Sequence, residues 1–141
     1  GIVAASDVVV VADDATFALT EVKLGLTPAV ISLTVFPRMT PRGAALTALG
    51  GEVFTGAEAR DLGLATYAVP SAELAAQVDR VVGQIASGAA QGLRETKRLL
   101  GAELLERIDA KGEELVELSA RLFGSDEARE AMTAFLSRKK G

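Results

Sequence analysis

The sequence predicts an α/β part followed by an all-helical region. The valines at residues 8–11 lie between acidic residues, and such a short β-branched run is typical of a strand buried on both faces. From Leu74 onward, apolar residues recur at intervals of three and four, which is the helical period. We therefore expect residues 1–70 to form the α/β part and residues 71–141 the helical region.

Capping and breaking residues define the first elements after this strand. An extended segment is expected at residues 16–19, and a helix at residues 29–36. A second helix should begin after Thr40, because a threonine hydroxyl is a good N-cap. Gly50 and Gly51 should end it, since glycine readily adopts the left-handed conformation after a helix.

A capping box marks the next helix. The Thr55 hydroxyl should accept from the Glu58 amide, while the Glu58 carboxylate accepts from the Thr55 amide. Gly63 is expected to end this short helix, and residues 64–69 are expected to form a strand. Ser71 should then cap the helix that follows.

The helical region carries long apolar stripes, and Ser125 is placed to cap its last helix. The longest stripe consists of Leu104, Ile108, Leu115, Leu118 and Leu122. Apolar faces of this kind need a partner surface, and closed symmetric assembly is the usual solution. We therefore expect the chain to associate with copies of itself.

Composition excludes several functional classes. The 141 residues have a formal net charge of −4, which argues against nucleic-acid binding. Cysteine and histidine are absent, so the chain can form no disulfide, cysteine or histidine metal site, or imidazole base. We expect no metal, no redox cofactor, no membrane span and a cytoplasmic location. Proton transfer has to come from other groups, chiefly carboxylates.

The first residues point to a longer polypeptide. Residues 1–6 are small and apolar, and no capping side chain precedes them. Because chain ends are usually exposed and polar, we expect the native chain to extend upstream of Gly1.

Five segments, in order and at matching spacing, resemble the crotonase (enoyl-CoA hydratase/isomerase) family. The longest, at residues 5–28, is similar to the family's "ACD" strand and the "F-G-x-P-E-x-x-L-G-x-x-P" segment that follows it. The others are Phe54–Ala59 with Gly63-Leu64, Val69-Pro70 with Glu73-Leu74, Lys97, and residues 125–136.

The resemblance implies the C-terminal half of a spiral of ββα units, followed by a helical region that drives trimer formation. A homotrimer or a dimer of trimers is therefore expected. The implied ligand is an acyl-CoA thioester, whose enolate is stabilised between two backbone amides in an oxyanion hole. The first of these amides should lie upstream of Gly1, so this chain alone is expected to be inactive. The alternative is a non-catalytic module that binds acyl-CoA or only assembles.

The resemblance places the family's second glutamate at Glu21, which becomes the expected general acid/base of a hydratase (a lyase) or an isomerase. The alternative is a solvated glutamate at the end of a short strand. Gly1 falls where two-glutamate hydratases carry their first glutamate. One carboxylate suits double-bond isomerisation better than hydration, although Gly1 could instead serve close helix packing.

The segment after Glu21 is the expected substrate-binding segment. Pro28, Ala29, Val30 and Ile31 replace the family's glycine-rich turn, and the Ala29 amide lies near a helix start. The apolar side chains could equally line an acyl pocket or belong to the core. The basic residues 138–140 could reach a coenzyme A phosphate, but they also match the negative end of a helix.

Overall fold

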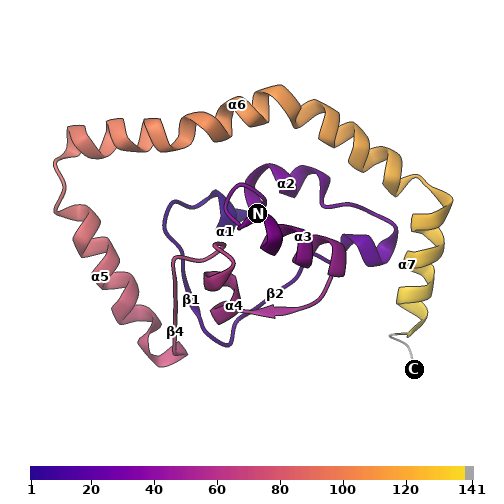
Figure 1. Cartoon of the computed structure of the whole chain (residues 1–141), viewed down its shortest axis with the longest axis horizontal. Coiled ribbons are helices and arrows are strands. Elements are labelled where there is room, and N and C mark those ends of the chain that lie inside the picture. Colours follow the sequence, from indigo (N-terminus) through magenta and orange to yellow (C-terminus); the bar gives the residue numbers. More distant parts are fainter. Residues whose placement is uncertain (139–141) are drawn as a thin grey trace.

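The computed structural model describes residues 1–138. Its last three helices form a frame around a smaller core of helices and strands. The core contains α1 (Ile2–Ala5), α2 (Ala29–Val35), α3 (Pro41–Gly50) and α4 (Gly56–Asp61) together with four short strands. The helices α5 (Leu74–Ala86), α6 (Ala90–Phe123) and α7 (Asp126–Arg138) run around its edge (Figure 1). The predicted order of an α/β part followed by helices is therefore observed.

Two pairs of strands tie the core together. β1 (Val10–Ala12) and β4 (Tyr67–Val69) are parallel, with Val11 opposite Ala68. β2 (Thr16–Phe17) and β3 (Phe54–Thr55) are antiparallel, and the rings of Phe17 and Phe54 stack with centroids 5.7 Å apart.

The predicted strands were too long. Val8 lies before β1 and is 38% exposed, so the expectation of a strand at residues 8–11 buried on both faces is wrong. β4 begins at Tyr67 rather than at Leu64, because the amides of Leu64 and Ala65 both donate to the Ala59 carbonyl oxygen (2.8 and 3.1 Å). These two residues complete the end of α4 instead of joining a sheet.

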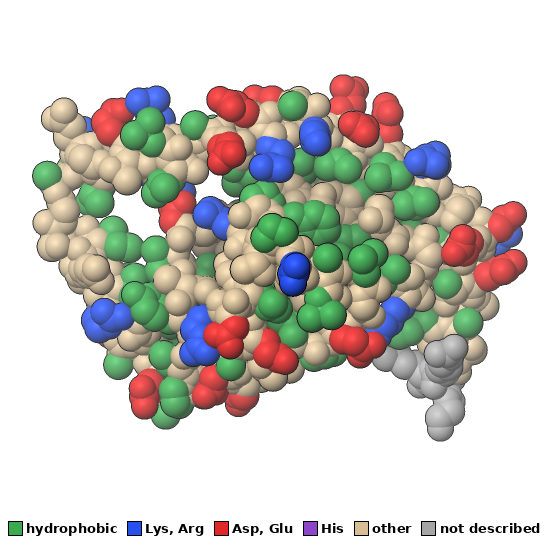
Figure 2. Space-filling view, viewed as in Figure 1, with side chains coloured by type: hydrophobic (Ala, Val, Ile, Leu, Met, Phe, Trp, Pro, Cys, Tyr) green, Lys and Arg blue, Asp and Glu red, His purple; other side chains and the backbone are tan. Residues whose placement is uncertain are grey.

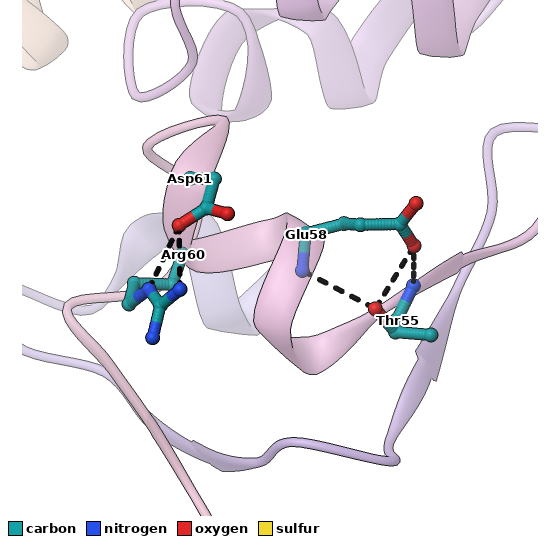
Figure 3. A network of polar contacts seen from close by, with 4 residues as sticks. All are labelled: Thr55, Glu58, Arg60 and Asp61. Carbon is teal, nitrogen blue, oxygen red and sulfur yellow. Dashed lines mark hydrogen bonds and ion pairs between the residues drawn. The ribbon is translucent and has the colours of Figure 1, made fainter.

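The predicted helix caps on α3, α4 and α7 are confirmed. Thr40 accepts from the Gly43 amide at the start of α3, and Ser125 accepts from the Ala128 amide at the start of α7. Thr55 and Glu58 form the capping box of α4 (Figure 3), with the Thr55 amide 2.6 Å from Glu58 Oε2. Beside it, Arg60 forms an ion pair with Asp61.

One predicted cap is wrong. Ser71 begins a short 3₁₀ helix, η2 (Ser71–Glu73), and α5 starts only at Leu74. The Ser71 hydroxyl donates to Asp14 Oδ1 (3.1 Å), so it links the helical region to the loop after β1 and does not cap α5.

Buried apolar residues from both halves of the α/β part form one core. Its largest members come from the strands β1 and β3 and from the loops and helices around them. They are Val11, Leu19, Val35, Met39, Phe54 and Leu64.

The helical region contacts this core at three places. α5 packs against β1, α6 packs along α2, and α7 packs against the 3₁₀ helix η1 (Glu21–Leu24). Between the first two contacts, the corner of α5 and α6 stands away from the core, and Figure 2 shows an opening there. Within residues 1–138, no helix is long and apolar enough to cross a bilayer.

Candidate functional site

Glu21 opens a tightly held turn. The buried residues Leu19 and Leu26 anchor the segment on either side of η1. The Glu21 carbonyl oxygen accepts from the Leu26 amide (3.0 Å), and Gly25 ends the turn in the left-handed conformation with φ 68°. The backbone that carries Glu21 is therefore fixed by both packing and hydrogen bonds.

The last helix of the chain closes over this turn. A Cβ at Gly25 would lie 3.2 Å from Glu127 Cγ and 3.3 Å from the Ala128 nitrogen. Ala128 itself has no exposed surface. Position 25 thus requires glycine both for its backbone conformation and for the close approach of α7.

The Glu21 side chain is partly buried, and its Oε2 atom is buried without a hydrogen-bond donor. Buried carboxylate oxygens are normally hydrogen-bonded to protein or to water, so an unsatisfied one calls for a specific explanation. Glu21 is not a solvated residue at a strand end, because η1 holds it in a 3₁₀ turn between α3 and α7.

Its neighbour Lys23 points to a different partner. Lys23 Nζ lies 2.8 Å from Glu52 Oε1, and this exposed pair joins η1 to the loop after α3. The hydrogen bond from Lys23 and its charge lower the pKa of Glu52 below its ordinary value. Lys23 is thus engaged away from the Glu21 carboxylate.

Gly1 and Ile31 lie together. A Cβ at Gly1 would be 3.8 Å from Ile31 Cγ1 and 3.9 Å from Cδ1, which is ordinary van der Waals contact. Close helix packing therefore does not require glycine at this position. A larger side chain here would lie directly over α2.

The other predicted substrate-binding residues are divided between three environments. Pro28 is buried and lines a cavity, Ala29 is 5% exposed and belongs to the core, and Val30 is 47% exposed. The Ala29 N–H donates to the Thr27 carbonyl oxygen (2.7 Å), so that amide is already engaged. Ile31 is half-buried and packs against the core. They do not form a single pocket.

The cavity beside Pro28 has a volume of about 540 Å³ and lies between α2, α3 and α6. Arg107 of α6 lines it, and the Arg107 Nε atom is buried without an acceptor. The sequence analysis did not single out Arg107. A lone arginine in a helix with many charges carries no signal, and only the packing of α6 on α2 buries this atom.

Within residues 1–138, no three acidic side chains lie close enough together to hold a metal ion. Lys139 and Lys140, considered above as phosphate ligands, lie outside the described residues, as does the side chain of Arg138.

Comparison with known proteins identifies the family. A model of the enoyl-CoA hydratase/isomerase family matches residues 1–141. A crystal structure of an enoyl-CoA hydratase from Mycobacterium avium superposes with a TM-score of 0.92 at 45% identity, covering 97% of this chain and 54% of that chain. An enoyl-CoA hydratase/isomerase from Pseudoalteromonas atlantica gives 0.85 at 25% identity, covering 97% and 56%.

A crotonyl-CoA hydratase from Syntrophomonas wolfei is 29% identical over 132 residues, which are 93% of this chain and 51% of that protein. This chain thus spans about half the length of these relatives. The match to the family extends from the first residue to the last, and it includes the turn that carries Glu21 and the helices that enclose it. The chain belongs to the enoyl-CoA hydratase/isomerase family.

Proposed function

We propose that the complete protein is an enzyme that acts on acyl-CoA thioesters, with Glu21 as the group that transfers protons. The observation that carries this proposal is the partly buried Glu21 carboxylate, one oxygen of which is buried without a partner. The sequence resemblance aligns it with the family's second glutamate. A carboxylate held on a rigid turn, with one oxygen unpaired by the rest of the chain, has the chemistry of a proton-transfer group.

The proposed reaction is double-bond isomerisation. Glu21 takes a proton from C2 of a 3-enoyl thioester, and the electron pair moves into a dienolate. The same carboxyl group then returns the proton to C4, which gives the 2-enoyl thioester. No proton is gained or lost overall, so a single carboxylate is sufficient.

Hydration of a 2-enoyl thioester remains the competing activity. It adds water across the double bond, and in two-glutamate hydratases both carboxylates hold that water. Gly1 supplies no carboxylate, although its surroundings would accept a larger side chain. We therefore favour the isomerase reaction and expect hydration to be the weaker activity.

The dienolate requires donors to its oxygen. Ala29 is a poor choice, because its N–H would have to leave the Thr27 carbonyl oxygen. We therefore assign the oxyanion hole to backbone amides elsewhere in the complete protein, where such donors stabilise developing negative charge.

We further propose that the protein assembles as a homotrimer or a dimer of trimers through the helical region. In support, α6 still exposes large apolar side chains after it has packed on α2, namely Leu99, Leu100, Leu105, Val116 and Phe123. Exposed apolar surface on this scale is typical of an interface.

The proposed function is tested by supplying the complete protein with crotonyl-CoA and with a 3-enoyl-CoA. Faster turnover of the 3-enoyl-CoA supports the isomerase, and faster hydration of crotonyl-CoA supports the hydratase. Turnover of neither substrate, with an acyl-CoA still bound in calorimetry, would contradict catalysis and leave a binding module.

A further inference from the structure

The outer side of α3 is largely apolar, whereas the solvent side of a surface helix is normally polar. Four exposed residues, spaced by three and four positions, lie together on this side: Arg42, Ala45, Leu46 and Leu49. They form the α3 face. Leu46 and Leu49 are 71% and 75% exposed, and Figure 2 shows hydrophobic side chains gathered over α3. A contiguous apolar surface of this kind is typical of an interaction site.

An acidic cleft lies beside the α3 face. It has a volume of about 290 Å³ and lies between α3, β3 and α4, with Leu46 and Leu62 among its apolar walls. Its lining residues all belong to the described part of the chain, and they include three carboxylates but no lysine or arginine. The carboxylates are those of Glu52, Glu58 and Asp61. Such a surface fits a partner that brings both an apolar side chain and a cation.

Arg42 is the cation that the α3 face itself supplies. Within residues 1–138, no ion pair or side-chain hydrogen bond engages its guanidinium, whereas Lys23 pairs with Glu52. The Glu52 side chain is still 82% exposed in that pair, and only its Oε1 atom takes part. The second carboxylate oxygen can therefore accept from another donor. One end of the α3 face thus carries a cation without a partner, and the other end adjoins acids that can accept one.

We propose that the α3 face docks on the α3 face of a second copy of this chain, antiparallel and about a two-fold axis. Under this symmetry each contact is made twice, because the same patch is used on both copies. The register that brings Arg42 beside the partner's Glu52 also sets Ala45 opposite the partner's Leu49. Leu46 then lies next to the axis. Charge and side-chain size are therefore complementary in a single register.

One such contact is small, because two single helices bury little surface. Between two trimers the contact is made three times, and linked contacts bind far more tightly than one alone. In that form the inference rests on the proposed assembly through α6. The contact itself involves neither Glu21 nor an acyl-CoA thioester.

The test is light scattering of the complete protein over a range of micromolar concentrations, with circular dichroism to show that each variant is folded. Leu46→Glu should reduce the molar mass of the assembly to about half, because it would bury an unpaired charge next to the axis. Arg42→Glu sets an acid against the acidic cleft and should raise the dissociation constant of the contact by about tenfold or more. An acid in the first turn of α3 suits the helix dipole, so the fold should be kept.

The charge-reversed pair provides the sharpest comparison. Adding Glu52→Arg to Arg42→Glu restores opposite charges and should return the dissociation constant to within about threefold of the parent value. Arg80→Glu makes the same charge change at an exposed position of α5 and is the matched control, which should leave the assembly unchanged.

The proposal is overturned by a monomeric parent, by an unchanged mass in Leu46→Glu, or by no recovery in the double variant. A lower melting temperature of Leu46→Glu at unchanged mass would show that another part of the same chain covers the α3 face, which also contradicts it. Where Leu46→Glu does not fold, the charge-reversed pair decides. A failure of the proposed trimer is distinguishable, because charges placed on α6 should reduce a dimer of trimers to about a third of its mass.

Discussion

Replacing Gly56 by alanine tests the contact that positions α4 against β1. A Cβ at Gly56 would lie 1.9 Å from the Ala12 carbonyl oxygen, 3.0 Å from its carbonyl carbon and 3.2 Å from Val11 Cγ2. The first two are backbone atoms and cannot turn away as a side chain would. Either β1 or the start of α4 must move by about 1 Å or more, in a core packed without spare volume.

The size of the effect follows from two opposing contributions. Overpacking a well-packed site costs about 1–3 kcal/mol, and a clash between backbones belongs at the upper end. Alanine restricts the unfolded chain more than glycine does, which returns about 0.4–1 kcal/mol. We therefore expect Gly56→Ala to lower the free energy of unfolding by about 2 kcal/mol.

The assay is urea unfolding of the complete protein followed by circular dichroism, with Gly83→Ala as the control. Gly83 lies inside α5, and a Cβ there meets nothing within 4 Å. Alanine should therefore stabilise that helix by about 0.5–1 kcal/mol. If Gly56→Ala were as stable as the parent, the close approach of α4 to β1 would be refuted.

Two further predictions concern the helix caps and the assembly. Hydrogen bonds from the Thr55 amide and hydroxyl lower the pKa of Glu58, so the folded state binds a proton less readily than the unfolded state. The resulting stability is present above the ordinary pKa of 4.5 and is lost as the pH falls through the lower folded value. Glu58→Gln can still cap the helix but does not titrate, so it should flatten this acid-side loss of stability in thermal melts recorded between about pH 3 and 7. An unchanged pH profile would contradict the capping geometry. Charged replacements at Leu105 and Val116, two of the exposed apolar residues of α6, should dissociate the assembly in light scattering before helix content falls. A parent protein that is already monomeric at micromolar concentration would contradict the assembly proposal.

The features that the sequence predicted correctly are those decided by local chemistry. The Thr40, Thr55 and Ser125 caps each need only one side chain and an amide three residues away. Gly63 also ends its turn as expected, with φ 90°. Such interactions are complete within a few residues, so no knowledge of the remaining fold is required.

The two errors have different causes. Leu64 and Ala65 donate to the Ala59 carbonyl oxygen, a local bond that ends α4 beyond the left-handed Gly63 and shortens β4. The hydroxyl of Ser71 is taken by Asp14, which is distant in the sequence and is not recognisable from the residues around Ser71. Periodicity predicts which face of a helix or strand is buried. It does not predict which carbonyl or carboxylate oxygen will accept a hydrogen bond from a given residue.

The candidate site, too, was predicted from the sequence only in part. The family resemblance placed the expected general acid/base at Glu21, but the burial of its Oε2 atom depends on tertiary packing. Likewise, the apolar residues from Pro28 to Ile31 were expected as a substrate-binding segment, yet their burial ranges from core to solvent. Which side of a short helix faces a cavity depends on where α3 and α6 pack.

The most direct test of the account is the turnover of Glu21→Gln in the complete protein, compared with Glu52→Gln. Glutamine keeps the shape of Glu21 but cannot accept a proton, so we expect turnover of the preferred enoyl-CoA to fall by about 10²–10⁴-fold with an unchanged melting temperature. Glu52→Gln removes an equally charged but exposed residue of the same region and should retain the parent rate. Near-parental turnover in Glu21→Gln would contradict the central claim that this carboxylate transfers the proton.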